Sequence, residues 1–299
     1  MRVIVHGGAG GEPRAPESRQ AVLDDAADRG VTESTPLDAV VRAVEVLETS
    51  PRFNAGIGSA VQSDGTIRTD AGVMTDDGRA GAVCSMESVE HALAAARVVL
   101  EETPHVLVSG EHARSLAGEY GIDTDVDLWS ERSRERWESE SPPEGPAGEQ
   151  LDWIEEHFGD TSSRTPEDHD TVGAVAVEEG QVAAATSTGG RWYALAGRVG
   201  DVPQLGAGFF ATDAGGASAT GAGEAIARTG VARSAVGHLA NGDDPEIAAT
   251  RAIDELDALT GDSAGVIVAD ADGTVGSAYN SDAMQTSVAT DSPSAGDTA

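Results

Sequence analysis

Lysine is absent from this chain of 299 residues, so its 19 basic residues other than histidine are all arginines. The 52 acidic residues outnumber them and give a formal net charge of −33. Such a surface repels phosphates and anionic lipids, so no nucleic acid and no membrane partner is expected. Self-repulsion of this size destabilises a compact chain unless salt screens it, and at 1 M salt the Debye length is about 3 Å. The composition therefore predicts a halophilic protein; the alternative is an ordinary acidic protein.

Cysteine is nearly absent as well, and long apolar runs are missing. Cys84 is the single cysteine, which excludes a disulfide within the chain, and its apolar neighbours in AGAVCSM predict a small core residue. No apolar run approaches the ~20 residues of a membrane span. The opening MRVIVHGGAG lacks a basic region followed by a long apolar stretch, so it is interpreted as a strand and not as a signal peptide. A cytoplasmic location is expected.

Apolar periodicity divides most of the chain into helices and strands. It predicts helices over residues 15–30, 34–48, 88–102, 111–120, 221–240 and 243–259. Apolar runs bounded by turn residues predict strands over residues 2–5, within 54–74, over 105–110, and as hairpins over 171–187 and 264–280. Thr35 and Asp244, each followed by proline, are the predicted N-caps of two helices. Because the strands come mostly in hairpins, we expect an α+β fold with antiparallel sheets covered by helices.

The character of the chain changes between about residues 124 and 170. This segment is charged, rich in Ser, Pro and Gly, and nearly free of aliphatic residues, which predicts an acidic linker without fixed structure. Alternating Arg and Glu early in the segment allow a short exposed helix, and residues 151–160 allow an amphipathic turn. A second polar stretch, from Ser287 to the end, is predicted to be frayed.

Several common sequence motifs of binding and catalytic sites do not match this chain. Gly8 and Gly10 begin a G-x-G pattern after the first strand, but Pro13 and the lack of a βαβ unit argue against a dinucleotide site. The seven histidines have no metal-ligand spacing, and there is no G-x-S-x-G nucleophile elbow. The threonines remain as candidates: Thr171 begins a strand, and Thr220 with Gly221 begins a helix. Taken singly, each has an ordinary explanation in strand propensity or helix capping.

Six segments considered together are more informative than any single threonine. HGGAG, FNAGIGS, HDTVGAVAV, TSTGG, GRVGD and ATGAGE occur in this order, and the chain resembles the plant-type asparaginases, or isoaspartyl peptidases, from about Arg2 to Ser287. These are N-terminal nucleophile (Ntn) hydrolases. The resemblance implies a single domain over residues 1–299 with a four-layer αββα sandwich. It also implies autocatalytic cleavage between Asp170 and Thr171, giving an α chain, 1–170, and a β chain, 171–299.

The resemblance also implies catalytic roles. Thr171, once it is an N-terminus, is the implied nucleophile, because its free α-amine, with a pKa near ~8, acts as its base. Thr188 is implied to orient Thr171, and Asn54 to help position Thr171 and water. Thr220 and Gly221 are implied to form the oxyanion hole through a hydroxyl and a backbone N–H.

Substrate binding is implied for three residues. Arg198 of GRVGD is implied to bind the substrate α-carboxylate as a two-pronged donor, while Asp201 and Gly223 bind its α-ammonium group. Asp201 has an alternative role as a structural partner of Arg198. Arg191-Trp192-Tyr193, after STGG, is bulkier than is usual in the family and leaves open the preference between asparagine and β-aspartyl dipeptides.

The loop LETSPRFNAGI resembles the family's sodium-binding loop. Oxygen ligands of this kind suit a hard cation. The implied ligands are the backbone carbonyls of Leu47, Glu48, Ser50, Phe53, Ala55 and Ile57. The ion is structural, and no cofactor is expected for the chemistry.

The resemblance predicts a hydrolase for the side-chain amides of L-asparagine and of isoaspartyl peptides, active as a homodimer of αβ units. Two enzyme alternatives are a glycosylasparaginase and a threonine aspartase. The first is usually lysosomal or secreted, and the second is not expected to keep GRVGD. An alternative from another class is a binding protein for small amino acids that never matures.

Overall fold

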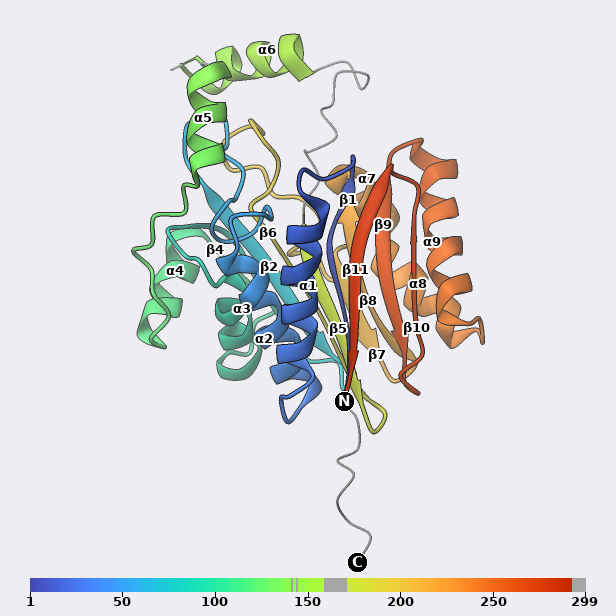
Figure 1. Ribbon diagram of the computed structural model, residues 1–299. Helices are drawn as coiled ribbons and strands as arrows, with labels where there is room; N and C mark the ends of the chain where they lie inside the picture. Colours follow the sequence, from blue (N-terminus) through green and yellow to red (C-terminus); the bar gives the residue numbers. More distant parts are fainter. Residues whose placement is uncertain (141, 144, 159–170, 292–299) are drawn as a thin grey trace, which may run out of the picture.

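Two β-sheets form the centre of the chain (Figure 1). The computed structural model describes residues 1–140, 142–143, 145–158 and 171–291. The larger sheet has the strand order β11-β1-β5-β6-β2-β3-β4. These strands are β1 (Arg2–Gly10), β2 (Arg68–Thr75), β3 (Ala80–Glu87), β4 (Leu107–Ser109), β5 (Val172–Glu178), β6 (Gln181–Thr188) and β11 (Ala283–Thr290). The smaller sheet has the order β10-β9-β8-β7, formed by β7 (Phe209–Thr212), β8 (Gly215–Gly221), β9 (Ala264–Asp270) and β10 (Val275–Tyr279).

Helices cover the outer face of each sheet (Figure 1). The larger sheet is covered by α1 (Pro16–Gly30), α2 (Pro36–Thr49), α3 (Ala92–Glu102) and α4 (Gly110–Glu119). The smaller sheet is covered by α8 (Val231–Ala240) and α9 (Pro245–Thr260), with the short α7 (Gly223–Thr229) beside them. Neighbouring strands are antiparallel apart from β3 and β4. The predicted α+β fold with αββα layers is therefore confirmed.

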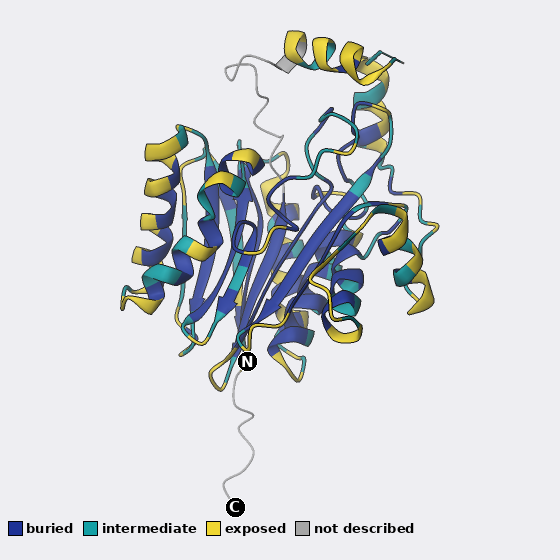
Figure 2. Cartoon of the chain, turned by 180° about the vertical axis from the view of Figure 1, so that it is seen from behind, coloured by how far each residue is buried: buried dark blue, intermediate teal, exposed yellow. Residues whose placement is uncertain are grey.

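Three apolar layers hold this sandwich together. Strand β5 shows why its sequence is a continuous apolar run: Val172, Ala174 and Ala176 pack toward the helices, while Val175 and Val177 pack between the sheets. A strand that is buried on both faces needs no alternation of polar and apolar residues. Figure 2 shows the strands almost wholly buried, with exposed residues on the outer faces of the helices. Within the described ranges, no helix has the length and hydropathy that a bilayer crossing requires.

The turn between β5 and β6 fixes the register on which the site depends. Glu179 and Gly180, the predicted turn residues, both have positive φ, at 49° and 82°. Such two-residue turns match the twist of antiparallel strands. The resulting register pairs Glu178 with Gln181 at one end and Val172 with Ser187 at the other.

The acidic segment corrects the prediction of an unstructured linker. Its residues form α5 (Glu131–Glu140) and α6 (Ala147–Phe158), so the short helix is present and residues 151–158 of the predicted turn belong to a helix. Trp137 and Trp153 from this segment pack on Tyr193, and Trp129 packs on Trp137. Trp192, Val126 and Leu128 belong to the same cluster. Few aliphatic residues are needed because the aromatic rings supply the buried apolar area. Residues 159–170 lie outside the described residues.

Other boundaries also differ from the predictions. The polar stretch from Ser287 is not frayed at its start, because β11 continues to Thr290 and pairs with β1. The helix predicted over 221–240 is divided at Gly230, whose left-handed φ of 69° ends α7 and begins α8. The first strand runs beyond residue 5 through the glycines to Gly10.

The two predicted helix caps differ in outcome. The Thr35 hydroxyl accepts a hydrogen bond from the backbone N–H of Asp38 at 3.2 Å, which confirms it as the N-cap of α2. Asp244 stands at the N-cap position of α9, but its side chain makes no capping hydrogen bond. The neighbouring Pro245 at the first helical position still favours a helix start there.

Candidate active site

Thr171 lies immediately before β5, and its side chain is almost fully buried. Its hydroxyl donates a hydrogen bond to the Thr188 hydroxyl at 3.2 Å. The Thr188 oxygen also accepts from the backbone N–H of Gly190 at 3.1 Å. Thr188 is thus held from two sides, and its contact with Thr171 agrees with the predicted orienting role. Asp170, the other predicted cleavage-site residue, lies outside the described residues.

A narrow cleft brings most of the predicted site residues together. It is lined by Thr171, Thr188, Gly190, Arg191, Arg198, Gly200, Asp201, Gly221 and Gly223. These residues come from both sheets and from the loop after β6. Six of the eight predicted catalytic and substrate-binding residues are in this lining. Of the other two, Thr220 directly precedes Gly221 in the chain, and Asn54 contacts Gly190 through a hydrogen bond.

Thr220 and Gly221 end β8, just before α7. The Thr220 oxygen is fully buried and accepts a hydrogen bond from the backbone N–H of Ala9 at 3.3 Å. Because that lone pair is occupied, the Thr220 hydroxyl proton can be donated elsewhere. Gly221 has a φ of 134°, and an added Cβ would lie 2.6 Å from the Ala264 Cα, so glycine is required there. Gly221 lines the cleft and Thr220 precedes it in β8, and their predicted oxyanion-hole role stays a prediction.

Asn54 supports one wall of the cleft through hydrogen bonds. Its side-chain amide donates to the Gly190 carbonyl at 2.5 Å, and its side-chain oxygen accepts from the Ala60 N–H at 2.7 Å. Its own carbonyl accepts from the Gly189 N–H at 2.8 Å. Among the described residues no hydrogen bond joins Asn54 to Thr171. Asn54 therefore fixes the Gly189–Gly190 wall of the cleft, and its predicted action on Thr171 and water stays a prediction.

Arg198 and Asp201 form the charged end of the cleft, and Glu224 joins them. Arg198 donates from Nε to Glu224 at 2.8 Å. Burial acts to lower the pKa of Arg198, but the hydrogen bond to Glu224 and the negative charges of Glu224, Asp201 and Asp70 together outweigh it, so the pKa is raised. Burial raises the pKa of Glu224, yet Arg198 lowers it overall to about 2. Glu224 is part of ATGAGE, but the sequence prediction assigned it no role.

Asp201 is buried, and burial raises its pKa to about 7 against the opposing effect of Arg198. Gly223 faces both side chains: an added Cβ would lie 2.6 Å from Arg198 Nη2 and 2.8 Å from Asp201 Oδ1. The absence of a side chain at position 223 thus leaves room for a ligand between them. The arrangement offers a fixed cation and a carboxylate within one small space.

Asp70 is a second buried carboxyl group that the sequence prediction missed. It pairs with Thr188 across β2 and β6, and it accepts from the Ser85 N–H at 2.8 Å. Burial raises its pKa to about 7, with Arg198 acting in the opposite direction. An aspartate inside the buried strand RTDAGVM is itself an unusual signal, since buried carboxyl groups are rare without partners.

A neutral polar network lies beneath Thr171. His6 Nε2 is 2.9 Å from the Ser218 hydroxyl, which is 2.7 Å from the Thr186 hydroxyl. Burial lowers the pKa of His6 to about 3, so the ring is neutral. An added Cβ at Gly173 would collide with both the Ser218 hydroxyl and the His6 ring. The network explains why the motif HDTVGAVAV has glycine at this position.

The predicted sodium loop is dense in carbonyl oxygens. Gly56 and Gly58 have positive φ, and an added Cβ at Gly56 would meet the carbonyl oxygens of Glu48 and Glu90. An added Cβ at Gly58 would lie 2.7 Å from the Phe53 carbonyl oxygen. The Glu48 carbonyl also accepts from the Ile57 N–H at 2.8 Å. The carbonyls of Leu47, Glu48 and Ser50 each accept a backbone N–H in this loop, and the predicted sodium ligation stays a prediction.

The three residues of the bulky Arg191-Trp192-Tyr193 segment lie in two different environments. Arg191 lines the cleft, whereas Trp192 and Tyr193 are buried in the aromatic cluster with Trp137 and Trp153. The Tyr193 hydroxyl donates to the Arg136 carbonyl in α5 at 2.9 Å. Only Arg191 is therefore placed to contact a ligand in the cleft directly.

The αββα layers and a threonine before β5 define the class of Ntn-hydrolases to which the asparaginase fold belongs. The asparaginase family model matches residues 1–296, so the chain belongs to this family. It is 41% identical to a plant-type L-asparaginase of Pyrobaculum calidifontis, over 94% of each chain. It is 35% identical to an isoaspartyl peptidase/L-asparaginase of Danio rerio, covering 93% of this chain and 89% of the other.

Proposed function

We propose that this protein hydrolyses the side-chain amide of L-asparagine to L-aspartate and ammonia, and cleaves isoaspartyl (β-aspartyl) peptides in the same way. One observation carries the proposal: the cleft that contains the paired Thr171 and Thr188 hydroxyls also contains Arg198 and Asp201. The first pair suits acyl transfer, and the second pair suits the two charged ends of an α-amino acid. The names of the relatives agree with this activity.

Maturation, the cleavage of the chain between Asp170 and Thr171, precedes turnover of the substrate. The Thr171 hydroxyl adds to the carbonyl carbon of Asp170, the peptide nitrogen is expelled as the α-amine of Thr171, and water hydrolyses the resulting ester. The products are an α chain, 1–170, and a β chain, 171–299. The new α-amine has an ordinary pKa near ~8, so it can accept a proton at neutral pH. Nucleophile and base then belong to one residue.

In turnover, the Thr171 amine removes the hydroxyl proton as the oxygen attacks the side-chain amide carbon. The negative charge that develops on the amide oxygen is met by the Thr220 hydroxyl and the Gly221 N–H. Loss of one such donor typically costs about 10²–10³ in rate. The amine returns the proton to the leaving nitrogen, and water then hydrolyses the acyl-enzyme to aspartate.

Substrate recognition uses opposite charges at both ends of the amino acid. Arg198 binds the α-carboxylate, which replaces Glu224 as its partner. Asp201, in its ionised form, binds the α-ammonium group together with the Gly223 backbone. This leaves the side-chain amide of the substrate to reach Thr171.

Two further parts of the proposal concern support of the site. The carbonyls of the loop 47–57 hold a sodium ion, which stabilises the loop that carries Asn54. The chemistry itself uses no cofactor. The active form is a homodimer of αβ units.

Ammonia release and chain cleavage test the function together. In molar salt, wild-type protein and Thr171→Ala are compared, with Thr250→Ala as control because Thr250 lies exposed on α9. Wild type and control are expected to show two chains and ammonia release from L-asparagine, and Thr171→Ala a single inert chain. Ammonia release by Thr171→Ala would contradict the nucleophile. Activity on a glycosylated asparagine but not on asparagine would favour a glycosylasparaginase, and an inert intact wild type a binding protein.

A further inference from the structure

The loop that follows β6, residues 189–198, is here called the cleft loop because three of its residues line the cleft: Gly190, Arg191 and Arg198. The structure describes every residue of this loop, and none of them lies in a helix or a strand. Contacts from outside the loop must therefore fix its course. Whatever holds its second end decides where Arg198, the proposed carboxylate-binding residue, lies.

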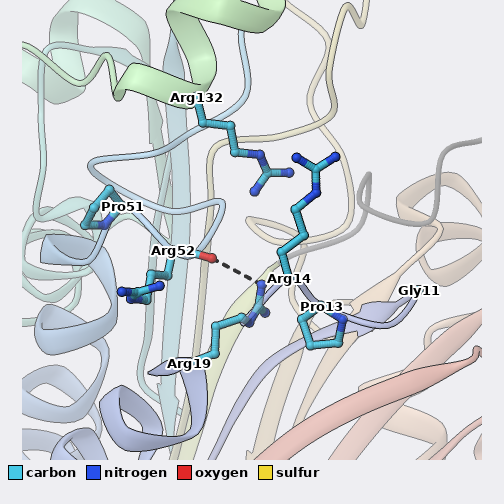
Figure 3. A pocket seen from close by; sticks show the side chains of 7 residues that line it. All are labelled: Gly11, Pro13, Arg14, Arg19, Pro51, Arg52 and Arg132. Carbon is cyan, nitrogen blue, oxygen red and sulfur yellow. Dashed lines mark hydrogen bonds between the residues drawn. The ribbon is translucent and has the colours of Figure 1, made fainter. Parts of the chain in front are cut away.

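The first end of the cleft loop is held by Asn54, which contacts both Gly189 and Gly190. The segment that carries Asn54 is itself attached to α1, because Arg19 donates to the Arg52 carbonyl at 3.1 Å (Figure 3). This end of the loop is thus tied to the outer helical layer. The second end has a different anchor.

The side chain of Gln62, which is almost fully buried, holds the second end of the cleft loop. Its Oε1 accepts from the backbone N–H of Gly197 at 2.8 Å, and its Nε2 donates to the carbonyl of Arg198 at 3.2 Å. The backbone N–H of Arg198 donates separately to the Leu195 carbonyl at 2.8 Å. Both backbone polar groups of Arg198 therefore have partners, and Gln62 is the partner from outside the loop.

Arg68 fixes the orientation of the Gln62 amide. Its Nη1 donates to Gln62 Oε1 at 2.7 Å, and its Nη2 lies 3.1 Å from a carboxylate oxygen of Glu87. A guanidinium group has only donors, so the amide oxygen must face Arg68 and the Gly197 N–H. The amide NH2 group must then face the Arg198 carbonyl. Position 62 thus requires an acceptor and a donor on one side chain, which glutamine supplies.

The turn that presents Gln62 is also fixed by hydrogen bonds. The Gln62 N–H donates to the Thr66 carbonyl at 3.0 Å, and the Gly65 N–H donates to the Gln62 carbonyl at 3.0 Å. The next residue, Ser63, accepts from the Ala196 N–H of the cleft loop through its hydroxyl at 2.9 Å. Gln62 therefore holds the cleft loop from a backbone that is itself held in place.

We propose that Gln62 is a positioning residue for substrate recognition: it holds the backbone of Arg198 so that the guanidinium group meets the α-carboxylate of the substrate. This inference rests on the proposed function, in which Arg198 binds that carboxylate. Gln62 is not among the described residues of the cleft lining, so it acts through Arg198 and not on the substrate.

The guanidinium group of Arg198 lies close to two glycines of the cleft. An added Cβ at Gly200 would lie 2.8 Å from Nη1, and one at Gly223 would lie 2.6 Å from Nη2. The two Nη atoms are therefore available for a two-pronged contact with a carboxylate in the cleft. Such a contact depends on position, since a displacement of about 1 Å can cost on the order of 10²-fold. The backbone bond from Gln62 should thus affect binding of the substrate more than the chemical step.

Substitutions at position 62 test this role in steady-state kinetics. Gln62→Met keeps the length of the side chain but removes its hydrogen bonds, so the KM for L-asparagine should rise on the order of tenfold while kcat changes less than about threefold. Gln62→Glu keeps the acceptor but places an oxygen against the Arg198 carbonyl, so its KM should rise as well. Gln20→Met is the matched control, because Gln20 on α1 also makes side-chain hydrogen bonds, and it should change neither constant. Rates are normalised to the amount of cleaved chain seen on denaturing gels.

A second substitution shows whether the effect passes through Arg198. Arg198→Lys keeps the positive charge but loses the two-pronged geometry. Gln62→Met should lower kcat/KM for asparagine on the order of tenfold in the wild-type background and less than about twofold in the Arg198→Lys background. A residue that only stabilises the fold would lower kcat/KM by the same factor in both backgrounds.

The possible results separate this inference from the proposed function. An unchanged KM in cleaved Gln62→Met, or equal losses of kcat/KM in the two backgrounds, would overturn the role of Gln62 and leave the proposed function in place. If Gln62→Met does not fold, a wild-type KM in Gln62→Glu would overturn it instead. Wild-type protein that releases no ammonia from asparagine would overturn both.

Discussion

Asp201 is expected to make the free protein less stable as the pH rises toward neutrality. Burial raises its pKa from 3.8 to about 7 in the folded chain, so the folded state holds a proton that the unfolded state has already released. Between these two values the unfolded chain binds fewer protons, and the free energy of unfolding therefore falls with increasing pH. A rise in the pKa from 3.8 to about 7 corresponds to a loss of about 4 kcal/mol in the free energy of unfolding. This loss is complete near pH 7 and stays constant above it.

Replacement of Asp201 by asparagine removes this dependence of stability on pH. The stability of Asp201→Asn relative to wild type is expected to increase from near zero at pH 4 to at most about 4 kcal/mol at pH 8. Asp70 is present in both proteins, so its own titration cancels to a first approximation. Urea unfolding at fixed molar salt, repeated at each pH, measures the difference. Asp257→Asn, on the exposed face of α9, is the matched control and should show no such trend.

Activity should move in the opposite direction to stability. Only the ionised Asp201 binds the α-ammonium group, so the KM for asparagine in wild-type protein should rise as the pH falls below about 7. In Asp201→Asn the KM should be high at every pH. A stability difference that does not change between pH 4 and pH 8, or a variant that binds asparagine normally, would refute this account of Asp201.

Three further predictions concern single side chains. Thr188→Val keeps the volume but removes the hydroxyl that accepts from Thr171, so kcat should fall at least about tenfold with little change in KM, measured by ammonia release. Gly223→Ala places a methyl group against Arg198 and Asp201, so the KM for asparagine should rise at least about tenfold while chain cleavage continues. Tyr193→Ala removes the ring on which Trp137 and Trp153 pack, at a cost of about 3 kcal/mol or more. Since all four tryptophans belong to this cluster, their fluorescence should shift to the red.

The pairing of the two threonines was accessible from the sequence. A two-residue turn at Glu179 and Gly180 places Glu178 opposite Gln181, and counting back along both strands brings Thr171 opposite Thr188. The turn was predicted, so local rules suffice to place these two threonines opposite one another, although Thr188 was identified through the resemblance. The charged pair Arg198 and Asp201 was found through the GRVGD motif, and the fold places both residues in the cleft.

Other features depend on contacts between distant segments. Helices α5 and α6 lie in a polar sequence, and the apolar partners that fix them, Trp192 and Tyr193, are supplied by another loop. Strand β11 is an edge strand that buries only some of its residues, so its sequence is polar and carries a weak signal. The surroundings of Asp70, which lies opposite Thr188 and accepts from the Ser85 N–H, arise only in the folded chain.

The mass of the purified wild-type protein tests the central claim most directly. If Thr171 is a nucleophile made by cleavage, mass spectrometry and N-terminal sequencing should find two chains, residues 1–170 and 171–299, and the second should begin Thr-Val-Gly-Ala. The cleaved protein should release ammonia from asparagine. A single intact chain that is nevertheless active, or a cut at another bond, would contradict the account.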